Sequence, residues 1–417
     1  MQHELQVKIM KELMSQLDGG RNVDAGVQYK APTSVYTCKD IAKKEWDSFF
    51  QNHPQLIGMS GDLLEPDTFF TIDDFGTPIL ATRDREGKFR AFLNACRHRG
   101  VRVAHEARGK AVKFTCPFHA WTYASSGDLV AIPNNDHFGE VDKTCMGLVE
   151  LPAVEKYGLL FVHPQPDGAI DVDALLGNFK SEIEDADYGR LQYSGETEID
   201  MNLNWKLAND TFGETYHFQK LHKNTLGHIF FGDNLSYETD GNNHRFVFAS
   251  KNIDTFREMP EEDWRLTEAS TVLYFLFPNV QFNVAPGGDL FLIKIYPHPT
   301  EVGRSITKVG VYFSKETIAQ AKVAEEEGRL AGAEDVLASG GDRIPPSLET
   351  VVELFSRIIQ DEDYLMGETT QRAADNGLLK ELIFGRNEPA LHHITTTIHS
   401  GKILVCPHLR KSRFPLS

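Results

Sequence analysis

The sequence predicts an α+β protein built from more than one domain. Its 417 residues exceed the size at which a single hydrophobic core usually stops growing. Residues 60–165 hold short apolar runs separated by turn residues, whereas residues 166–417 combine strand-like runs with longer helical stretches. We therefore expect a helical segment over residues 1–50, a β domain over residues 51–165 and a mixed domain over residues 166–417.

The expected elements follow in chain order. The first 20 residues alternate charged and apolar positions at helical spacing and lack the apolar block of a signal peptide, so they predict a short surface helix. Strands are expected in the β-rich segment at residues 69–72, 78–82, 89–93 and 158–162. Later strands are expected at residues 271–277, 289–296 and 306–313, and helices at residues 314–342, 347–374 and 377–384.

The composition is acidic. The chain carries 43 Lys and Arg against 60 Asp and Glu, a formal net charge of −17. Such a surface disfavours nucleic acid or an anionic membrane as the main partner, and the absence of an apolar run of about 18 residues argues against a membrane span. Five scattered cysteines favour a reducing cytoplasm over a disulfide scaffold. Cys38, Cys145 and Cys406 are expected to be packing residues.

The strongest motif pairs cysteine with histidine twice: Cys96 with His98, and Cys116 with His119. A Rieske [2Fe–2S] centre needs this set, because two thiolates bind one iron and two imidazoles bind the other. A structural zinc site is the alternative, but zinc fingers pair cysteine with cysteine and histidine with histidine. The mixed pairs therefore favour the cluster.

A second histidine pair, His217 and His222, lies five residues apart. On a regular α-helix this spacing turns the two side chains about 140° from each other, so one metal requires a π-bulge or a helix break. Glu214 precedes His217 by three residues and is expected on the same face. Two histidines and one distant carboxylate form the facial triad of non-haem Fe(II) oxygenases. Surface or core histidines are the alternative interpretation.

The carboxylate is expected on the helix over residues 347–374. Periodicity predicts a buried stripe on that helix, and an unpaired charge on or beside such a stripe is costly unless a metal binds it. Asp361, Glu362 and Asp363 lie on or beside it, and periodicity does not distinguish among them. A solvated acidic face is the alternative. The stripe consists of Phe355, Ile358, Ile359, Leu365 and Met366.

Residues 97–113 carry six cations against the single acid Glu106, in a chain of charge −17. This local reversal predicts a docking patch for an acidic electron donor, with ordinary solvated loop charges as the alternative. The cations are Arg97, Arg99, Arg102, Arg108, Lys110 and Lys113.

Most of the chain resembles the family of Rieske non-haem iron aromatic-ring-hydroxylating oxygenase α (terminal oxygenase) subunits. The landmarks are CRHRG, CPFHAWTY, NWKLANDTFGETYHFQKLH and GRNEPALHH. The resemblance implies a Rieske antiparallel β domain, and a helix-grip catalytic domain (an antiparallel sheet with long helices) on which the N-terminal helix packs. It assigns Cys96, His98, Cys116 and His119 to the cluster, and His217, His222 and Asp363 to the mononuclear iron. Asp363 is chosen because Glu368 and Gln371 follow it at the family spacing.

The resemblance also implies a homotrimer or a trimer-based assembly, in some members with a β subunit. The cluster of one subunit would then lie beside the iron of its neighbour, with Glu214 linking His217 to His119 of the next chain. Many members have Asp at that position, so Glu214 departs by one methylene group. Ala120 and Asp210 also replace the more usual Gly and Asn.

These features predict a cytoplasmic terminal oxygenase that takes electrons, ultimately from NAD(P)H, through a ferredoxin or flavin reductase. With O2 it would hydroxylate, cis-dihydroxylate or oxidatively demethylate a small aromatic or other apolar substrate. One alternative is a monooxygenase acting on a quaternary amine or related N-methyl compound. Another is a zinc-stabilised binding protein without enzymatic activity. Candidate pocket residues, with ordinary core packing as the alternative, are Phe212, Leu226, Phe230, Phe275, Phe277, Phe282 and Phe291.

Overall fold

The computed structural model describes residues 1–330 and 347–400, which form two compact units. The larger unit comprises residues 1–44, 175–186, 193–330 and 347–400, and the smaller unit comprises residues 45–174 and 187–192. Cys406 and part of the helix expected at 314–342 lie outside the described residues. The domain limits expected at residues 50 and 165 stay a prediction.

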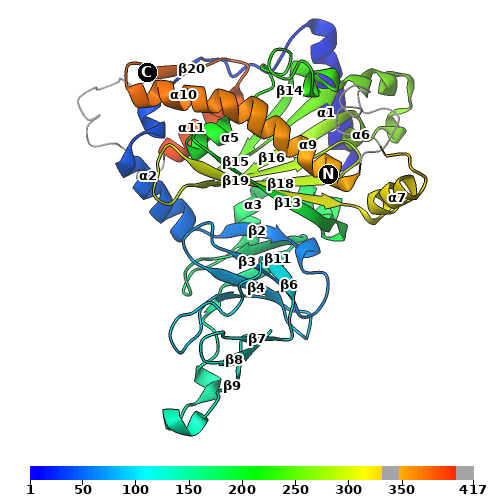
Figure 1. The fold of residues 1–417 in the computed structure, drawn as a ribbon. Helices are drawn as coiled ribbons and strands as arrows, with labels where there is room; N and C mark the ends of the chain where they lie inside the picture. The colour runs from blue at the N-terminus through cyan, green and yellow to red at the C-terminus, as the bar shows by residue number, and fades with distance from the viewer. Residues whose placement is uncertain (331–346, 401–417) are drawn as a thin grey trace. The chain divides into compact units, whose positions relative to one another are not determined.

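The smaller unit is built from three antiparallel sheets (Figure 1). All four strands expected in this part of the sequence are present, as β3, β4, β5 and β12. The strand order is β10-β5-β4-β3-β6 in the first sheet, β11-β12-β2 in the second and β7-β8-β9 in the third. The strands are β2 (Gln55–Met59), β3 (Thr68–Ile72), β4 (Ile79–Arg83), β5 (Phe89–Leu93), β6 (Arg108–Lys110), β7 (Lys113–Thr115), β8 (Thr122–Ala124), β9 (Leu129–Ala131), β10 (Glu150–Leu151), β11 (Ala153–Lys156) and β12 (Leu159–Val162).

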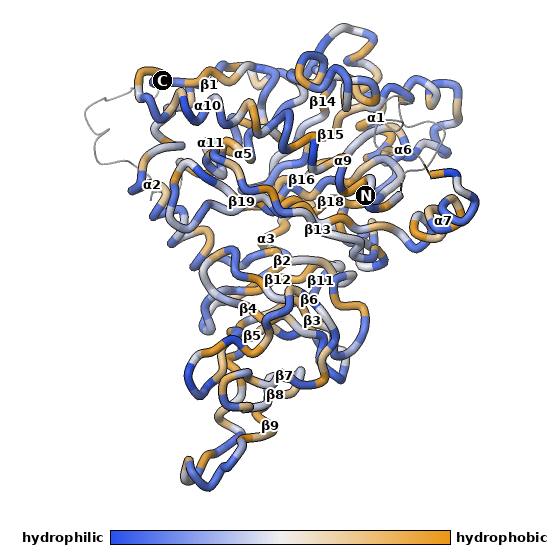
Figure 2. Tube along the Cα trace, in the orientation of Figure 1, coloured by the Kyte–Doolittle hydropathy of each residue, from blue (hydrophilic) through white to orange (hydrophobic). Residues whose placement is uncertain are grey.

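The larger unit is centred on a seven-stranded sheet of order β13-β19-β18-β17-β16-β15-β14. The pairings from β14 through β19 are antiparallel. Hydrophobic residues recur along these strands (Figure 2). Most positions of β15 to β19 are buried. The three strands expected here are confirmed as β16, β18 and β19. The strands are β13 (Gln192–Met201), β14 (Phe230–Asp240), β15 (Asn243–Ser250), β16 (Ser270–Leu276), β17 (Val280–Val284), β18 (Leu290–Pro297) and β19 (Ser305–Phe313).

Several of the helices pack against this sheet. The N-terminal helix α1 (His3–Gly19) is confirmed, and it packs against β14 and β15 through four buried residues: Ile9, Met10, Leu13 and Met14. Every helix in the described part of the chain is too short or too polar to span a lipid bilayer. The other α-helices are α2 (Lys39–Glu45), α3 (Val172–Leu176), α4 (Lys180–Ala186), α5 (Trp205–Asp210), α6 (Leu266–Ala269), α7 (Lys315–Glu326), α9 (Leu348–Ile358), α10 (Leu365–Asn376) and α11 (Pro389–Ser400).

One long helical rod crosses the seven-stranded sheet (Figure 1). It consists of α9, a π-helical turn (Ile359–Tyr364) and α10, and it ends at Gly377, whose φ of 72° stops the helix. The expected helix over 377–384 is wrong, because residues Glu381–Phe384 form strand β20, which pairs with β1 (Tyr29–Pro32). Pairing between segments about 350 residues apart overrides the local helical pattern.

Candidate metal centres

The two Cys/His loops of the smaller unit share one backbone design. In each loop the cysteine N–H donates to the carbonyl five residues later, Val101 or Trp121, at 2.8 Å. The residue four positions after each cysteine has a positive φ, 75° at Gly100 and 57° at Ala120. The two loops follow β5 and β7, so short strands hold both pairs of side chains in place.

The structure brings the four predicted cluster residues into one region. Cys96 and Cys116 are both 3% exposed, and the rings of His98 and His119 lie 4.6 Å apart between centroids. Nδ1 of His98 is buried and has no hydrogen-bond partner among the described residues. A buried imidazole nitrogen without a partner is costly unless a ligand uses its lone pair. The donor set of two thiols and two imidazoles therefore fits a Rieske [2Fe–2S] cluster.

Tyr123 and neighbouring rings support these loops. The Tyr123 hydroxyl lies 3.3 Å from Sγ of Cys96 and accepts the N–H of Arg97 at 3.0 Å. His98 stacks on Trp121, with ring centroids 5.3 Å apart. Burial, followed by the charges of His98 and Arg99, lowers the pKa of His119, which favours the neutral ring that a metal needs. Sequence reasoning had not singled out Tyr123 for this role.

The net positive charge of the basic patch expected at residues 97–113 is smaller than its composition indicates. Three of its six cations form ion pairs with acids of the smaller unit: Arg102 with Asp73, Arg108 with Asp62 and Lys110 with Glu65. Arg99 lies over the ring of Phe118 at 4.9 Å. Acids distant in sequence neutralise half of the patch, which a linear count of charges cannot show.

The cysteines outside the cluster motif differ from one another. Cys145 is exposed, so the expectation that it packs in a core is wrong. It lies in a short turn, where its Sγ donates to Asp142 at 3.4 Å. Cys38 is partly buried.

In the larger unit, the chain leaves α5 and runs through irregular turns over residues 211–225. The helix break that the histidine spacing required is therefore present. The expected contact between Glu214 and His217 is confirmed, because Glu214 accepts hydrogen bonds from the backbone N–H of His217 at 3.1 Å and from its Nδ1.

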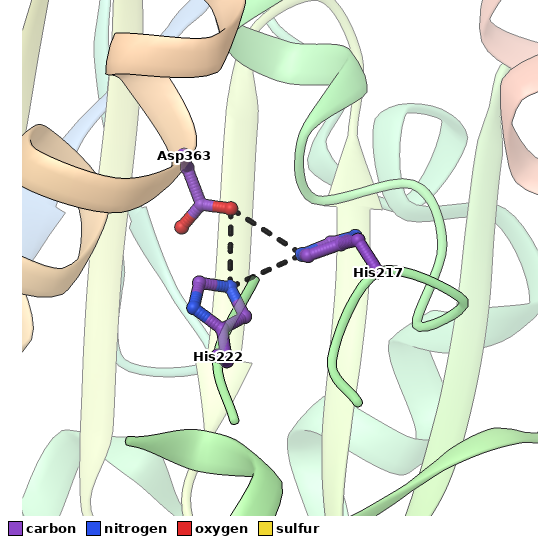
Figure 3. Close-up of side chains that lie close together, drawn as sticks. All are labelled: His217, His222 and Asp363. Carbon is purple, nitrogen blue, oxygen red and sulfur yellow. Dashed lines mark hydrogen bonds and ion pairs between the residues drawn. The ribbon is translucent and has the colours of Figure 1, made fainter. Parts of the chain in front are cut away.

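Three side chains converge at one point (Figure 3). Nε2 of His217 lies 3.1 Å from Nε2 of His222, and Oδ1 of Asp363 lies 3.3 Å and 3.2 Å from these two atoms. Ligands about 2.1 Å from an ion and about 90° apart around it lie about 3 Å from each other. The three atoms therefore have the spacing of a facial triad.

The three side chains stabilise one another's charged forms. Burial alone would lower the pKa of His217, but Asp363 and Glu214 outweigh it and raise this pKa to about 10. For His222, burial is likewise outweighed, chiefly by Asp363, so its pKa is also raised. Burial would raise the pKa of Asp363, yet the two histidines hold it below its ordinary value. In the metal-free protein, protons on the histidines balance the carboxylates.

The π-helical turn places the three acids, which periodicity could not distinguish, in different environments. Asp363 is 7% exposed and faces both histidines, whereas Asp361 is exposed. Leu365 and Met366 are 47% and 45% exposed, so their place on the buried stripe is wrong. The wider turn shifts the helical phase, and residues beyond it no longer follow the pattern of α9.

The residues at the family spacing from Asp363 tie α10 to the segment before α5. Glu368 accepts from the backbone and the side chain of Asn202 at 3.0 and 3.1 Å, and Gln371 accepts from the Asn204 N–H at 2.9 Å. This links the helix carrying the carboxylate to the chain segment that leads to the histidines.

A small cavity of about 60 Å³ adjoins the triad. Of the seven predicted pocket residues, Phe212 and Leu226 line it, whereas the other five do not. Sequence reasoning did not assign the other apolar lining residues to the pocket, because sheet register and the packing of the helical rod bring them together. They are Phe218, Phe246, Phe248, Leu273, Phe355, Ile358 and Ile359.

Asn283 also lines the small cavity, and its buried Oδ1 has no partner among the described residues. On another side of the triad a cavity of about 540 Å³ is lined by Glu214, His217 and Asp363 together with Lys220 and Met366, among others.

Comparisons with known proteins match both parts of the chain. The family model of the ring hydroxylating alpha subunit (catalytic domain) matches residues 188–400, and the Rieske [2Fe-2S] domain model matches residues 53–155. The carnitine monooxygenase oxygenase subunit of Acinetobacter baumannii is 27% identical over 70% of this chain and 78% of its own length. The benzene 1,2-dioxygenase subunit alpha of Pseudomonas putida is 29% identical over 44% of this chain and 42% of its own length.

Solved structures share the fold. A quaternary ammonium Rieske monooxygenase in complex with L-carnitine superposes with a TM-score of 0.69 at 21% identity, covering 89% of this chain and 94% of that one. Naphthalene 1,2-dioxygenase from Rhodococcus sp. superposes with a TM-score of 0.68 at 18% identity, covering 96% and 99%. The chain therefore belongs to the ring-hydroxylating alpha-subunit family of Rieske oxygenases, enzymes that combine a [2Fe–2S] cluster with a mononuclear iron and use O2 with electrons from NAD(P)H that arrive through a partner protein.

Proposed function

We propose that Cys96 and Cys116 bind one iron of the cluster and that His98 and His119 bind the other. The catalytic Fe(II) is held by His217, His222 and Asp363. The buried thiols, the unpartnered Nδ1 of His98 and the triad spacing of 3.1 to 3.3 Å support these roles. When bound, the cluster supplies electrons and the iron activates O2.

We further propose a cytoplasmic homotrimer or trimer-based assembly, with or without a β subunit, that accepts electrons from a ferredoxin or a flavin reductase. Glu214 would link His217 to His119 of the next subunit. Two observations support this role: Glu214 binds Nδ1 of His217, and it lines the cavity of about 540 Å³. A link between subunits requires such a side chain to be reachable from outside its own chain.

The substrate that the small cavity favours is an uncharged, mainly apolar molecule. The observation that carries this proposal is the lining, in which nine apolar side chains surround the triad, and the lining residues that the structure describes include neither lysine nor arginine. A substrate carboxylate would therefore be buried without a cationic partner, which is costly. Asn283 offers a hydrogen-bonding group beside Thr211 and Thr215, so the lining also suits a polar substituent on the substrate.

A second candidate is a substrate with a quaternary ammonium group. The relatives named for carnitine and glycine betaine oxidation support it, and five phenylalanines line the cavity, whose ring faces attract such a cation. These rings are Phe212, Phe218, Phe246, Phe248 and Phe355.

Turnover assays separate the two substrates. The iron-loaded protein would be combined with a ferredoxin–reductase pair, and NADH use, O2 use and products would be measured with toluene, indole, choline and carnitine. Hydroxylated toluene or indole, formed with matched O2 use, supports the apolar substrate. Formaldehyde or an aldehyde from choline or carnitine alone would replace it with the second candidate. Mass spectrometry of the products distinguishes one oxygen atom inserted from two.

A further inference from the structure

The imidazole of His222 is held at both of its nitrogens by consecutive residues. Its Nε2 lies 3.2 Å from Oδ1 of Asp363, and its Nδ1 lies 2.7 Å from Oε2 of Glu362. His222 itself is completely buried. Because the ring meets a carboxylate at each end, its rotation about χ2 is fixed from both sides.

These contacts also define the tautomer. An ionised carboxylate only accepts hydrogen bonds, so Nδ1 of His222 carries the proton that it donates to Glu362. When a metal replaces the Nε2 proton that faces Asp363, the ring stays protonated at Nδ1 and presents its Nε2 lone pair to the metal. A metal in the triad needs that lone pair.

Glu362 is itself oriented by a neighbour. The Thr225 hydroxyl donates to the same Oε2 at 3.1 Å, and Thr225 lies only three residues after His222. Glu362 and Asp363 belong to the π-helical turn, a feature that is frequent at functional sites. The adjacent Asp361 is exposed. The described hydrogen bonds and ion pairs of the two histidines with acids involve Glu214, Glu362 and Asp363, not Asp361.

We propose that Glu362 is a positioning residue that fixes the ring orientation and the Nδ1–H tautomer of His222 for metal binding. This inference rests on the proposed iron site. Under this proposal each histidine has its own carboxylate partner, Glu214 for His217 and Glu362 for His222, and the two carboxylates have different functions. Glu214 lines both cavities, whereas Glu362 lines neither. Replacing Glu362 therefore weakens metal binding, and replacing Glu214 mainly interrupts electron delivery.

The test uses the full chain with its cluster oxidised and its mononuclear site emptied by a chelator. Co(II) affinity is measured by equilibrium dialysis, and the Co(II) electron paramagnetic resonance spectrum is recorded at saturation, since the oxidised cluster is diamagnetic. Glu362→Ala should bind Co(II) about 10- to 100-fold more weakly and change the spectrum. Glu362→Gln keeps an accepting oxygen, so it should recover part of the affinity and most of the spectrum. Asp361→Asn, which removes one exposed charge from the same turn, should behave as wild type.

The outcomes are separable. The proposal is overturned if Glu362→Ala and Glu362→Gln bind Co(II) as tightly as wild type with an unchanged spectrum, even if the metal-free variants melt at a lower temperature. If Glu362→Ala does not fold, Glu362→Gln decides alone: weaker binding or an altered spectrum supports the proposal, and wild-type values refute it. His222→Ala is the reference. If it binds Co(II) like wild type, the proposed iron site itself is wrong, and the role of Glu362 is lost with it.

Discussion

The two candidate centres are built in opposite ways. The cluster loops use four residues within a span of 24, and their neighbours include Arg97 and Arg99. The triad combines two histidines with an acid 141 residues beyond His222, and it gathers three carboxylates: Glu214, Glu362 and Asp363. A local motif therefore defines the electron-accepting centre, whereas tertiary packing assembles the oxygen-activating centre and its negative charge.

The largest effect should come from Asp363→Ala. Removing the acid leaves two histidines, so the chain should lose about one iron while keeping the two irons and two sulfides of the cluster. Substrate oxidation should disappear, whereas the cluster spectrum stays. Iron and sulfide analysis beside the absorption spectrum measures this. Loss of the cluster iron as well would show that the two centres are not built independently.

Glu214→Gln should have the next largest effect. The variant should retain iron at both centres, yet turnover should fall by about 100-fold or more, because the proposed link between subunits loses its carboxylate. Steady-state O2 consumption and single-turnover reoxidation of the cluster measure the loss. Normal turnover would remove Glu214 from the electron path.

The pH dependence of stability should differ between the metal-free and the iron-loaded protein. The pKa of His217 in the metal-free fold is raised to about 10, above its ordinary value near 6.5. The contribution of protonated His217 to the free energy of unfolding is therefore fully present below pH 6.5. It is lost as pH rises toward 10, by at most about 1.4 kcal/mol per pH unit.

Melting temperatures between pH 7 and 9.5 test this sign. The metal-free protein should lose stability across that range, and His217→Gln should reduce the slope. The iron-loaded protein should lack this contribution, since the metal replaces the proton. Equal slopes for the metal-free and loaded proteins would contradict the electrostatic account of the empty triad.

The smallest expected effect concerns the residue with a positive φ in each of the two cluster loops. Ala120 has a φ of 57°, a region that costs a residue with a side chain about 1 kcal/mol, whereas Gly100 at 75° avoids this cost. Ala120→Gly should raise the unfolding free energy of the cluster-loaded protein by about 1 kcal/mol, and Gly100→Ala should lower it similarly. The double variant should melt close to wild type. A stabilising Gly100→Ala would refute the equivalence of the loops.

Much of the fold was predictable from sequence because the strands have short, strongly apolar patterns. The seven expected strands exist, and the expected helix break after α5 does too. The helix expected over 377–384 fails because β20 pairs with β1. The prediction that Leu365 and Met366 are buried is wrong, because one π-helical turn shifts the helical phase of the rod.

The sites show the same division. Cys/His spacing identifies the cluster residues, but the support from Tyr123 depends on folding. Periodicity placed Glu362 on or beside the buried stripe together with Asp361 and Asp363, although it could not indicate that Glu362 binds the far nitrogen of His222. The apolar lining of the small cavity depends on strand register, which single-sequence patterns do not define.

The hydrogen bonds from Asn202 and Asn204 to α10 have a consequence for iron supply. They fasten the helix of Asp363 to the segment that leads to the histidines, and none of these bonds includes a metal. Removal of the metal is therefore expected to leave the shape of the triad unchanged, unlike in a zinc finger, which folds only around its ion. We therefore expect protein stripped of its catalytic iron to regain that iron on reloading without refolding.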